Sequence, residues 1–471
     1  MANSALKVQF LGAARQVTGS CYLLYTEGFR LLIDCGMYQE RKLLARNWES
    51  FPVPPESIDV LLLTHAHLDH CGLIPKLVKE GFRGRIVSTA ASRDLAHIVL
   101  HDSARIQEED AAFKKRRHER EGRKGPYPVV PLYTPQDVRE AMPRFDTVGY
   151  GETVELSDDL TASFHDAGHI LGSAMIELRT SVNGEDRTLV FSGDIGQPGR
   201  PLVRDAVRFR EADYLVMEST YGNRRHEDAG DVEEQLAAVI NDTVERGGNV
   251  VIPTFAVERA QELMYTLGRL VRADRIPHLM AFLDSPMAVE VTEVFRRHRH
   301  ELNEEVQDVV ESGGRLFRFP RMHLVESVEE SKAINRIRGS CIILAGSGMC
   351  TAGRIKHHLV NNITRAESTI VFVGYQAQGT LGRRIVNGDR VVRILGADYP
   401  VVAKVAQIHG LSGHADQRGL LTWLKDLVRP PRRVFLTHGE ATAAEELASR
   451  LRARRDWHVE VPAYRQEFDL D

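Results

Sequence analysis

Three histidines and an aspartate lie within six residues of one another, directly after a short apolar stretch. Residues 58–63 (Ile-Asp-Val-Leu-Leu-Leu) are typical of a buried strand, and they run straight into His65, His67, Asp69 and His70. Imidazole nitrogens and carboxylate oxygens are ligands that suit Zn²⁺. On a turn, alternate side chains of this segment can point in different directions. One short segment can therefore supply part of two metal sites.

Further candidate site residues follow apolar strands or lie in glycine-flanked loops elsewhere in the chain. Taken one at a time, such residues have ordinary explanations, because a loop histidine often bonds to the backbone and a strand-end carboxylate often forms a salt bridge. The candidates are Asp34, His169, Asp194, Glu218, His414 and His438.

The elements that must position these residues change in pattern along the chain. From Leu6 to about Val203, short apolar strands separated by glycine-rich turns predict a mixed or antiparallel sheet system. After Tyr221, helical segments alternate with strands, which predicts βαβ units and a parallel sheet. From about Val391 the short strands return, followed by a helix at 420–427 and a strand at 433–437. The simplest interpretation is one domain interrupted by another.

Composition sets the outer limits on function. The chain has 471 residues, 43% hydrophobic and 27% charged, with a net charge of −4. These values are typical of a globular protein and exclude a histone-like polycation, although they leave room for a local basic groove. Five cysteines without a CxxC pair indicate reduced thiols. Because we find neither a signal peptide nor an apolar run of ~18 residues, we expect a cytoplasmic protein without membrane contact.

A basic run at 114–124 contains seven Lys or Arg residues and two Glu residues. The more common explanation of such a run is a solvated helix end or loop, and attraction of phosphate is the alternative.

The segment that holds His65, His67, Asp69 and His70 resembles the HxHxDH motif of metallo-β-lactamase-fold hydrolases. Asp34, His169 and Asp194 match further family positions in the expected order. The resemblance implies an αββα sandwich that holds two Zn²⁺ ions, with Mn²⁺ as the alternative and no organic cofactor. It assigns one ion to His65, His67 and His169, and the other to Asp69 and His70. Asp194 would be shared, and Asp34 would orient the histidine ligands.

The chain also resembles the β-CASP group, the nucleic-acid-processing branch of this fold. Glu218, His414 and His438 match its extra motifs, and the segments 253–263 and 346–353 look like parts of its inserted domain. The resemblance implies an α/β protein with a metallo-β-lactamase domain at 1–219 and 396–471 and a Rossmann-like β-CASP domain inserted at 220–395. His438, again at the end of an apolar strand, is the predicted last ligand of the second ion. The other histidine considered, His226, lies in a loop-like segment.

The residues divide into roles that suit phosphodiester hydrolysis. Asp69 and Asp194 would act with the metal ions, which at ~3.5–4 Å apart can activate water and clamp a phosphoryl group. The ribose alkoxide leaves poorly unless it is protonated, and a histidine held by a carboxylate is a suitable acid. His414 is therefore the predicted general acid, held by Glu218. The expected reaction is cleavage of single-stranded RNA, mainly endonucleolytic, with 5′-to-3′ exonucleolytic action as a second mode. The sequence leaves a monomer or a homodimer open.

Five residues are candidates for phosphate or RNA binding. Residues 346–348 form a glycine-rich turn between a strand and a helix, which can present backbone N–H groups to a phosphate, although a tight turn alone would explain the glycines. The candidates are Ser347, Gly348, Ser412, Arg259 and Arg354.

Two other functions share part of this evidence. A small-molecule metallohydrolase acting on a thioester or lactone would use the same metal ligands, but it has no use for a large insert or for both His414 and His438. A non-catalytic RNA-binding scaffold would tolerate lost ligands, and none is lost.

Overall fold

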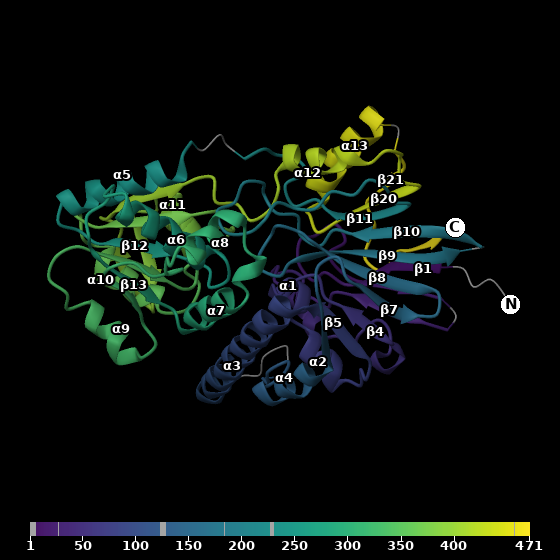
Figure 1. Cartoon of the computed structure of the whole chain (residues 1–471). Helices are drawn as coiled ribbons and strands as arrows, with labels where there is room; N and C mark the ends of the chain where they lie inside the picture. Colours follow the sequence, from purple (N-terminus) through teal and green to yellow (C-terminus); the bar gives the residue numbers. More distant parts are fainter. Residues whose placement is uncertain (1–5, 27, 123–128, 183, 227–229, 456) are drawn as a thin grey trace. The chain divides into compact units, whose positions relative to one another are not determined.

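The computed structural model describes residues 6–26, 28–122, 129–182, 184–226, 230–455 and 457–471. The chain divides into two compact units (Figure 1). Unit 1 consists of Met1–Pro198, Asp205–Arg225 and His414–Asp471, and unit 2 consists of Gly199–Arg204 and His226–Gly413.

Unit 1 contains two seven-stranded sheets. The first has the order β22-β1-β2-β3-β4-β5-β6 and the second the order β21-β20-β11-β10-β9-β8-β7. The strands of the first sheet are β1 (Leu6–Phe10), β2 (Tyr22–Tyr25), β3 (Arg30–Ile33), β4 (Val60–Leu62), β5 (Arg85–Thr89), β6 (Phe145–Val148) and β22 (Glu467–Leu470). Those of the second are β7 (Thr153–Ser157), β8 (Leu160–Asp166), β9 (Ala174–Val182), β10 (Glu185–Phe191), β11 (Tyr214–Glu218), β20 (Arg433–Thr437) and β21 (Val459–Glu460).

Both sheets of unit 1 are mixed, as the strand pattern predicts. In the first, β1, β2 and β3 pair antiparallel while β3, β4, β5 and β6 pair parallel. In the second, β8, β9 and β10 are antiparallel neighbours, and β10, β11 and β20 are parallel. Apolar side chains of the two sheets share one core, in which the rings of Phe10 and Phe435 lie 5.1 Å apart. Alternate residues of strands such as β1, β8 and β10 face that core, so a period-two pattern builds the sandwich.

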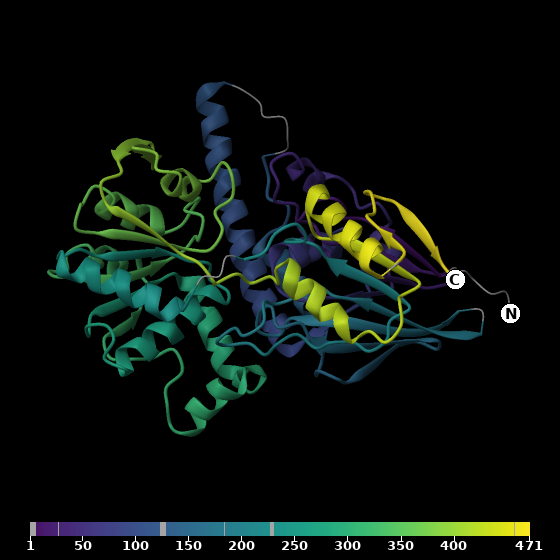
Figure 2. The same cartoon turned by 90° about the horizontal axis from the view of Figure 1, so that it is seen from above.

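Helices cover the outer faces of this sandwich. On the second sheet, Leu420, Trp423 and Leu447 pack against strand residues such as Val190 and Val434, and α13 lies along this face in Figure 2. The predicted αββα sandwich is thereby confirmed. The helices of unit 1 are α1 (Leu68–Cys71), α2 (Ile74–Lys79), α3 (Ala90–Glu121), α4 (Pro135–Ala141), α12 (Gln417–Trp423) and α13 (Ala441–Arg455), with short 3₁₀ helices at Leu44–Trp48, Pro55–Ser57, Met142–Arg144 and Leu424–Asp426.

Unit 2 is built on a six-stranded sheet in which every neighbouring pair is parallel, as the strand–helix alternation predicts. Its order is β14-β13-β15-β12-β16-β19. The strands are β12 (Val250–Pro253), β13 (Met280–Asp284), β14 (Met322–Leu324), β15 (Cys341–Ala345), β16 (Thr369–Val373) and β19 (Lys404–Ile408), with a hairpin of β17 (Val391–Ile394) and β18 (Ala397–Pro400). The helices are α5 (Val232–Glu245), α6 (Arg259–Arg272), α7 (Pro286–Arg297), α8 (Glu304–Glu311), α9 (Val328–Ile334), α10 (Ile355–Asn362) and α11 (Leu381–Val386), with a 3₁₀ helix at Arg299–Glu301.

The division between the units differs from the predicted domain boundaries. The predicted insert ends at residue 395, whereas unit 2 runs to Gly413 because β19 pairs in parallel with β16. At its start, unit 2 begins at His226 rather than at residue 220, and it also takes up Gly199–Arg204, where Val203 pairs with Leu302.

The basic run at 114–124 lies mostly on the last turns of α3. Its described residues are largely exposed, and Arg117 pairs with Glu121 at 2.9 Å. Arg123 and Lys124 lie outside the described residues. Within the described part of the chain, no helix is long and apolar enough to span a bilayer.

Candidate metal centre

The predicted ligands lie where strands of unit 1 end. Asp34 directly follows β3, and His65 comes three residues after β4. In the second sheet, Asp194 follows β10, and His438 is the first residue after β20. Because the carboxyl ends of parallel strands meet at one edge of a sheet, these residues gather at a single place. His169 joins them from the loop after β8, which runs in the same direction as β10.

Two glycines allow the site-bearing loops to approach one another closely. A Cβ at Gly36 would lie 1.7 Å from the backbone oxygen of Asp69. A Cβ at Gly196 would lie 1.7 Å from the backbone oxygen of Gly168, next to His169. The Gly196 N–H also donates a hydrogen bond to Ala167 at 2.8 Å. Only glycine permits such contacts, so these positions fix the spacing of the site.

One carboxylate oxygen of Asp194 faces a first set of histidines. Its Oδ2 lies 3.4 Å from His65 Nε2 and 3.5 Å from His169 Nε2. His67 Nδ1 lies 3.0 Å from His65 Nε2 and 3.1 Å from His169 Nε2. All four ligand atoms lie within 4.8 Å of one another.

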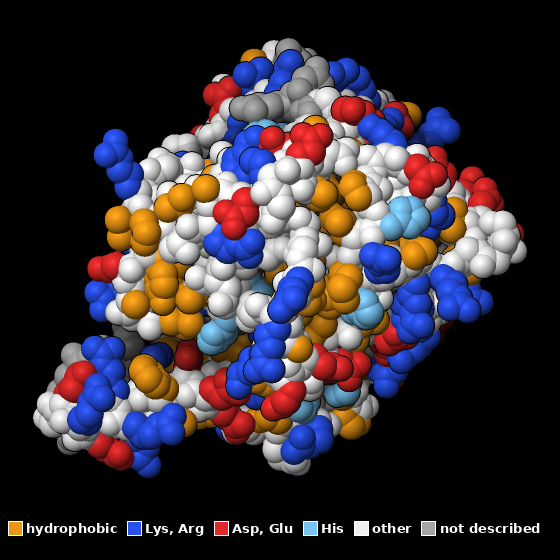
Figure 3. All heavy atoms as spheres, turned by 90° about the vertical axis from the view of Figure 1, so that its left-hand side faces the viewer, with side chains coloured by type: hydrophobic (Ala, Val, Ile, Leu, Met, Phe, Trp, Pro, Cys, Tyr) orange, Lys and Arg blue, Asp and Glu red, His pale blue; other side chains and the backbone are white. Residues whose placement is uncertain are grey.

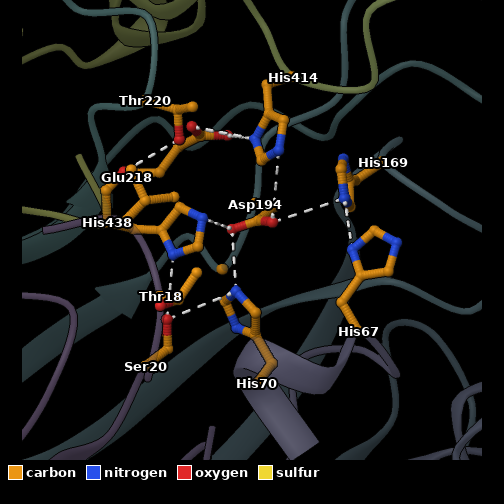
Figure 4. A network of polar contacts seen from close by, with 12 residues as sticks. Thr18, Ser20, His67, His70, His169, Asp194, Glu218, Thr220, His414 and His438 are labelled. Atoms are coloured by element: carbon orange, nitrogen blue, oxygen red, sulfur yellow. Dashed lines mark hydrogen bonds and ion pairs between the residues drawn. The ribbon is translucent and has the colours of Figure 1, made fainter. Parts of the chain in front are cut away.

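The other oxygen of Asp194 faces a second set. Its Oδ1 lies 3.2 Å from His70 Nε2 and 3.4 Å from His438 Nε2 (Figure 4). Asp69, His70 and His438 form a further group with ligand atoms within 4.8 Å. The structure therefore brings together all seven predicted metal ligands, with Asp194 between the two groups.

These distances fit metal coordination. In a tetrahedron with metal–ligand bonds of about 2.0–2.1 Å, neighbouring ligand atoms lie about 3.3–3.4 Å apart. The separations around Asp194 range from 3.2 to 3.5 Å. Within the described part of the chain, its buried Oδ1 accepts no hydrogen bond. A buried carboxylate oxygen that faces two imidazole nitrogens without such a bond is suited to a shared cation.

Partners behind the histidines hold two of the rings in place. Asp34 Oδ2 lies 2.7 Å from His70 Nδ1, and Thr64 donates to the same carboxylate through its N–H and its hydroxyl, both at 2.8 Å. Ser20 Oγ lies 3.1 Å from His438 Nδ1. With Nδ1 occupied in this way, Nε2 of each ring is the nitrogen that faces Asp194.

Glu218 and His414 form a pair beside the metal ligands. Both oxygens of the Glu218 carboxylate lie near His414 Nδ1, at 3.2 and 3.3 Å. The Ile195 N–H donates to Glu218 Oε1 at 2.6 Å and holds the carboxylate in place. His414 Nε2 lies 3.9 Å from Asp194 Oδ2. His414 itself is held by bridge pairing with Gly196.

Burial and charge give the histidines different protonation states. Burial, together with neighbouring imidazoles, keeps the pKa of His67 and of His169 well below the usual range and lowers that of His438 to about 3. A neutral imidazole is the form that binds a metal. Burial also opposes protonation of His70, but Asp194 and Asp34 outweigh it and raise its pKa well above the usual range. A metal ion would have to displace that proton.

The pKa of His414 is raised, in contrast to the lowered pKa values of His67, His169 and His438. Burial alone would lower its pKa, but the carboxylates of Glu218 and Asp194 outweigh it and raise the pKa to about 9. The imidazolium form is therefore favoured at neutral pH, and its Nε2 is directed toward Asp194. Such a group can donate a proton.

The predicted phosphate-binding residues all lie in unit 2, and both arginines already have partners there. Arg259 donates to Glu262 and to the Leu411 backbone, and Arg354 donates to Asp284 at 2.6 Å. These contacts weigh against direct phosphate binding by either guanidinium, and this role stays a prediction.

The serine candidates are placed differently. Ser347 Oγ accepts hydrogen bonds from the backbone N–H groups of Thr351 and Ala352, so it stabilises the turn at 346–353. Gly348 lies in the same turn, and Ser412 is a half-buried residue shortly before His414. Their contact with RNA also stays a prediction.

Four supporting residues were not singled out from the sequence. Ser20 and Thr64 contact the histidines or their carboxylate partner, as described above. Ser192 Oγ accepts from the Glu218 N–H at 3.0 Å, and Thr220 donates to the His438 backbone at 2.9 Å. Of these four residues, Thr64 alone could have been suspected from the sequence, because it directly precedes His65.

Comparisons with known families match most of the chain. A metallo-beta-lactamase superfamily domain matches residues 14–242, a Beta-Casp domain matches residues 260–385, and a Zn-dependent metallo-hydrolase RNA specificity domain matches residues 398–462.

Curated relatives extend the match over nearly the full length. Ribonuclease TTHA0252 of Thermus thermophilus is 40% identical over 435 residues, which cover 92% of this chain and 93% of the relative. Transcription termination factor FttA of Methanosarcina mazei is 33% identical over 455 residues, covering 94% of this chain and 68% of the relative. A crystal structure of an Enterococcus faecalis protein of unknown function aligns over 99% of this chain and 100% of its own, with a TM-score of 0.57 and 10% identity. This last similarity concerns the fold alone.

We expect Gly196→Ala to lower the free energy of unfolding by about 1–3 kcal/mol or more. The added Cβ would overlap backbone atoms, which cannot rotate away as a side chain can. The control is Gly28→Ala, where no atom lies within 4 Å of the added Cβ. Its effect should stay within about 0.5 kcal/mol. Urea unfolding measures both. Equal stability of the two variants would contradict the close packing of the loops that carry His169 and Asp194.

Proposed function

The chain belongs to the β-CASP family of metallo-β-lactamase-fold metallo-hydrolases, and from this premise we propose that it is a two-zinc ribonuclease acting on single-stranded RNA. The main mode of cleavage in this proposal is endonucleolytic, and 5′-to-3′ exonucleolytic action is the second mode. The five cysteines are buried and free, which fits the reducing cytoplasm as the place of action.

The proposal gives each ion its own ligands. His65, His67 and His169 would hold one ion, and Asp69, His70 and His438 would hold the other. Asp194 would be shared between them. When bound, zinc supplies Lewis-acid chemistry that lowers the pKa of water and neutralises charge on a phosphoryl group.

The leaving oxygen of the ribose receives its proton from His414 in this mechanism. Glu218 at Nδ1 keeps the ring protonated and fixes its orientation, so the proton available for transfer is the one on Nε2. Asp194, 3.9 Å from Nε2, keeps this atom beside the metal ligands. Proton donation of this kind contributes typically ~10²–10⁴-fold to a rate.

The Glu218–His414 pair is the observation that carries the ribonuclease proposal. A strongly basic leaving group such as a ribose alkoxide needs an acid, and this pair supplies a protonated imidazole next to the shared carboxylate. A thioester has a better leaving group, a thiolate, and gains less from such an acid. The similarity to a protein named as a ribonuclease supports the same choice over the small-molecule hydrolase.

A zinc titration of the metal-depleted chain tests the proposal, with cleavage of 5′-labelled single-stranded RNA as the readout. Activity should rise with zinc and saturate near two equivalents, and a parallel titration with manganese identifies the preferred ion. Internal cuts give labelled fragments of many lengths, whereas 5′-to-3′ trimming releases labelled mononucleotides. Metal-loaded protein that hydrolyses a thioester or lactone but leaves RNA intact would contradict the ribonuclease proposal.

We expect Asp194→Ala to lose both metal ions and all detectable RNA cleavage together, because each ion is proposed to share this carboxylate. Metal analysis of the purified variant measures the loss. Asp158→Ala, at an exposed aspartate in the turn between β7 and β8, should keep the wild-type metal content. A purified Asp194→Ala protein with two equivalents of metal would contradict the bridging role.

Two further variants should separate His438 from His414, although both histidines face Asp194. His438→Ala should lower metal content and activity, because His438 is a proposed ligand. His414→Ala should keep the metal and slow RNA cleavage by ~10²–10⁴-fold. It should largely spare a nitrophenyl phosphodiester, whose leaving group departs without a proton. Metal analysis and the two substrates measure this difference.

Glu218→Gln should show a weaker form of the His414→Ala result, because glutamine retains hydrogen bonding but not the charge that favours the imidazolium. If His414→Ala loses a metal ion, or slows both substrates equally, His414 belongs among the ligands instead.

A further inference from the structure

Two aromatic side chains are exposed at one edge of the unit 2 sheet. Phe255 is 45% exposed and Tyr375 is 53% exposed. Each is the second residue after a strand, Phe255 after β12 and Tyr375 after β16. These strands are parallel neighbours, with Val251 paired to Ile370. Their carboxyl ends therefore lie side by side, which is where open parallel sheets bind their ligands.

The turn after β15 connects the two aromatic loops. The Phe255 ring packs so closely on Gly348 that a Cβ at this glycine would lie 2.8 Å from ring atoms. Gln376, the residue after Tyr375, donates to the Gly348 carbonyl at 3.1 Å. Both aromatic loops therefore contact Gly348 in the turn after β15. Both rings retain a large solvent-accessible surface.

The surroundings of the rings suit a polyanion. Residues 254–256, 346–353 and 374–380 contain neither Asp nor Glu. The backbone N–H groups of Gly348 and Met349 donate no hydrogen bond within the described part of the chain. Arg383 donates to the Gln376 backbone and places a positive charge beside the Tyr375 loop.

Electrostatic attraction to phosphates is one source of affinity for RNA, and it depends on a concentration of positive charge. On the face that Figure 3 shows, Lys and Arg side chains are mixed with Asp and Glu side chains, and the net charge of the chain is −4. Stacking of bases on aromatic rings is the other main source of affinity for single strands, and it does not depend on sequence.

We propose that Phe255 and Tyr375 form a base-stacking platform for single-stranded RNA. The inference rests on the proposed function, and it adds a binding site in unit 2 to the metal centre in unit 1. The two rings stack on unpaired bases, while the acid-free loops and the N–H groups of the 346–353 turn accommodate the phosphates.

The test measures binding of a short fluorescein-labelled phosphorothioate oligouridine to the metal-loaded full chain by fluorescence anisotropy. A matched strand with abasic sites in place of the bases reports the backbone contribution alone. The variants are Phe255→Ala, Tyr375→Ala and two milder changes. Phe255→Leu keeps apolar packing on Gly348 but removes the ring, and Tyr375→Phe keeps the ring but removes the hydroxyl. Phe113→Ala, at an aromatic residue of α3 that is 60% exposed, is the matched control.

The wild-type chain should bind the base-bearing strand at least about 5-fold more tightly than the abasic strand, which is the lower end of the contribution of one stacked base. Phe255→Ala, Phe255→Leu and Tyr375→Ala should each lose at least about 5-fold on the base-bearing strand and leave the abasic strand unchanged. Tyr375→Phe and Phe113→Ala should bind as the wild type does. All variants should keep wild-type turnover of a nitrophenyl phosphodiester.

Three results would overturn the platform: unchanged affinity in the alanine variants, an equal loss on both strands, or a loss in Tyr375→Phe as large as in Tyr375→Ala. The same data separate this inference from the proposed function. A wild-type chain that binds RNA with base-dependent affinity but never cleaves it contradicts the ribonuclease alone. A chain that cleaves RNA while the alanine variants keep full affinity contradicts the platform alone.

Discussion

The buried carboxylate of Asp194 imposes the constraint on which the rest of unit 1 depends. A charge at this depth costs several kcal/mol unless it is well paired, and here each oxygen faces its own pair of imidazole nitrogens. Four chain segments must therefore converge to within a few tenths of an ångström. Strand ends in two packed sheets can hold them there, because the strands are fixed by their neighbours. Asp34 and His438 even adopt positive φ angles of 59° and 45°, a strained conformation that such a framework can support.

The parts of this arrangement that depend on local pattern could be predicted from the sequence. The cluster from His65 to His70 stands out because several ligand-type side chains directly follow an apolar strand. The strand at Thr369–Val373 and a helix at 256–272, which the structure forms at Arg259–Arg272, follow from residue types and periodicity over one short window. The αββα sandwich and the order of the remaining ligands came from resemblance to a known family, because no spacing rule connects Asp194 to a histidine 244 residues later.

What could not be predicted depends on contacts between distant residues. Ser20 supports His438 across 418 positions of sequence, and a serine before a strand carries no sign of that role. The predicted boundary at residue 396 differs from the end of unit 2 because β19 pairs with β16. Such pairing depends on contacts between distant residues, which no local pattern indicates. α13 was missed for another reason. Its buried residues, among them Ala444, Leu447 and Leu451, have helical spacing, but alanine marks an apolar face only weakly.

The contrast between His414 and His438 shows how one residue type can take two roles within a single site. Both rings direct Nε2 toward Asp194, so the shared carboxylate does not distinguish them, although His438 is buried more deeply than His414. The difference lies behind the ring. Nδ1 of His414 faces the Glu218 carboxylate, whose charge favours a second proton on the ring, whereas Nδ1 of His438 faces the Ser20 hydroxyl. Burial opposes protonation of both rings, but at His414 the carboxylates of Glu218 and Asp194 outweigh it and raise the pKa to about 9. At His438, burial and the neighbouring imidazoles lower the pKa to about 3. A carboxylate behind the ring suits an acid, and a neutral hydroxyl leaves the imidazole uncharged and able to bind a metal ion.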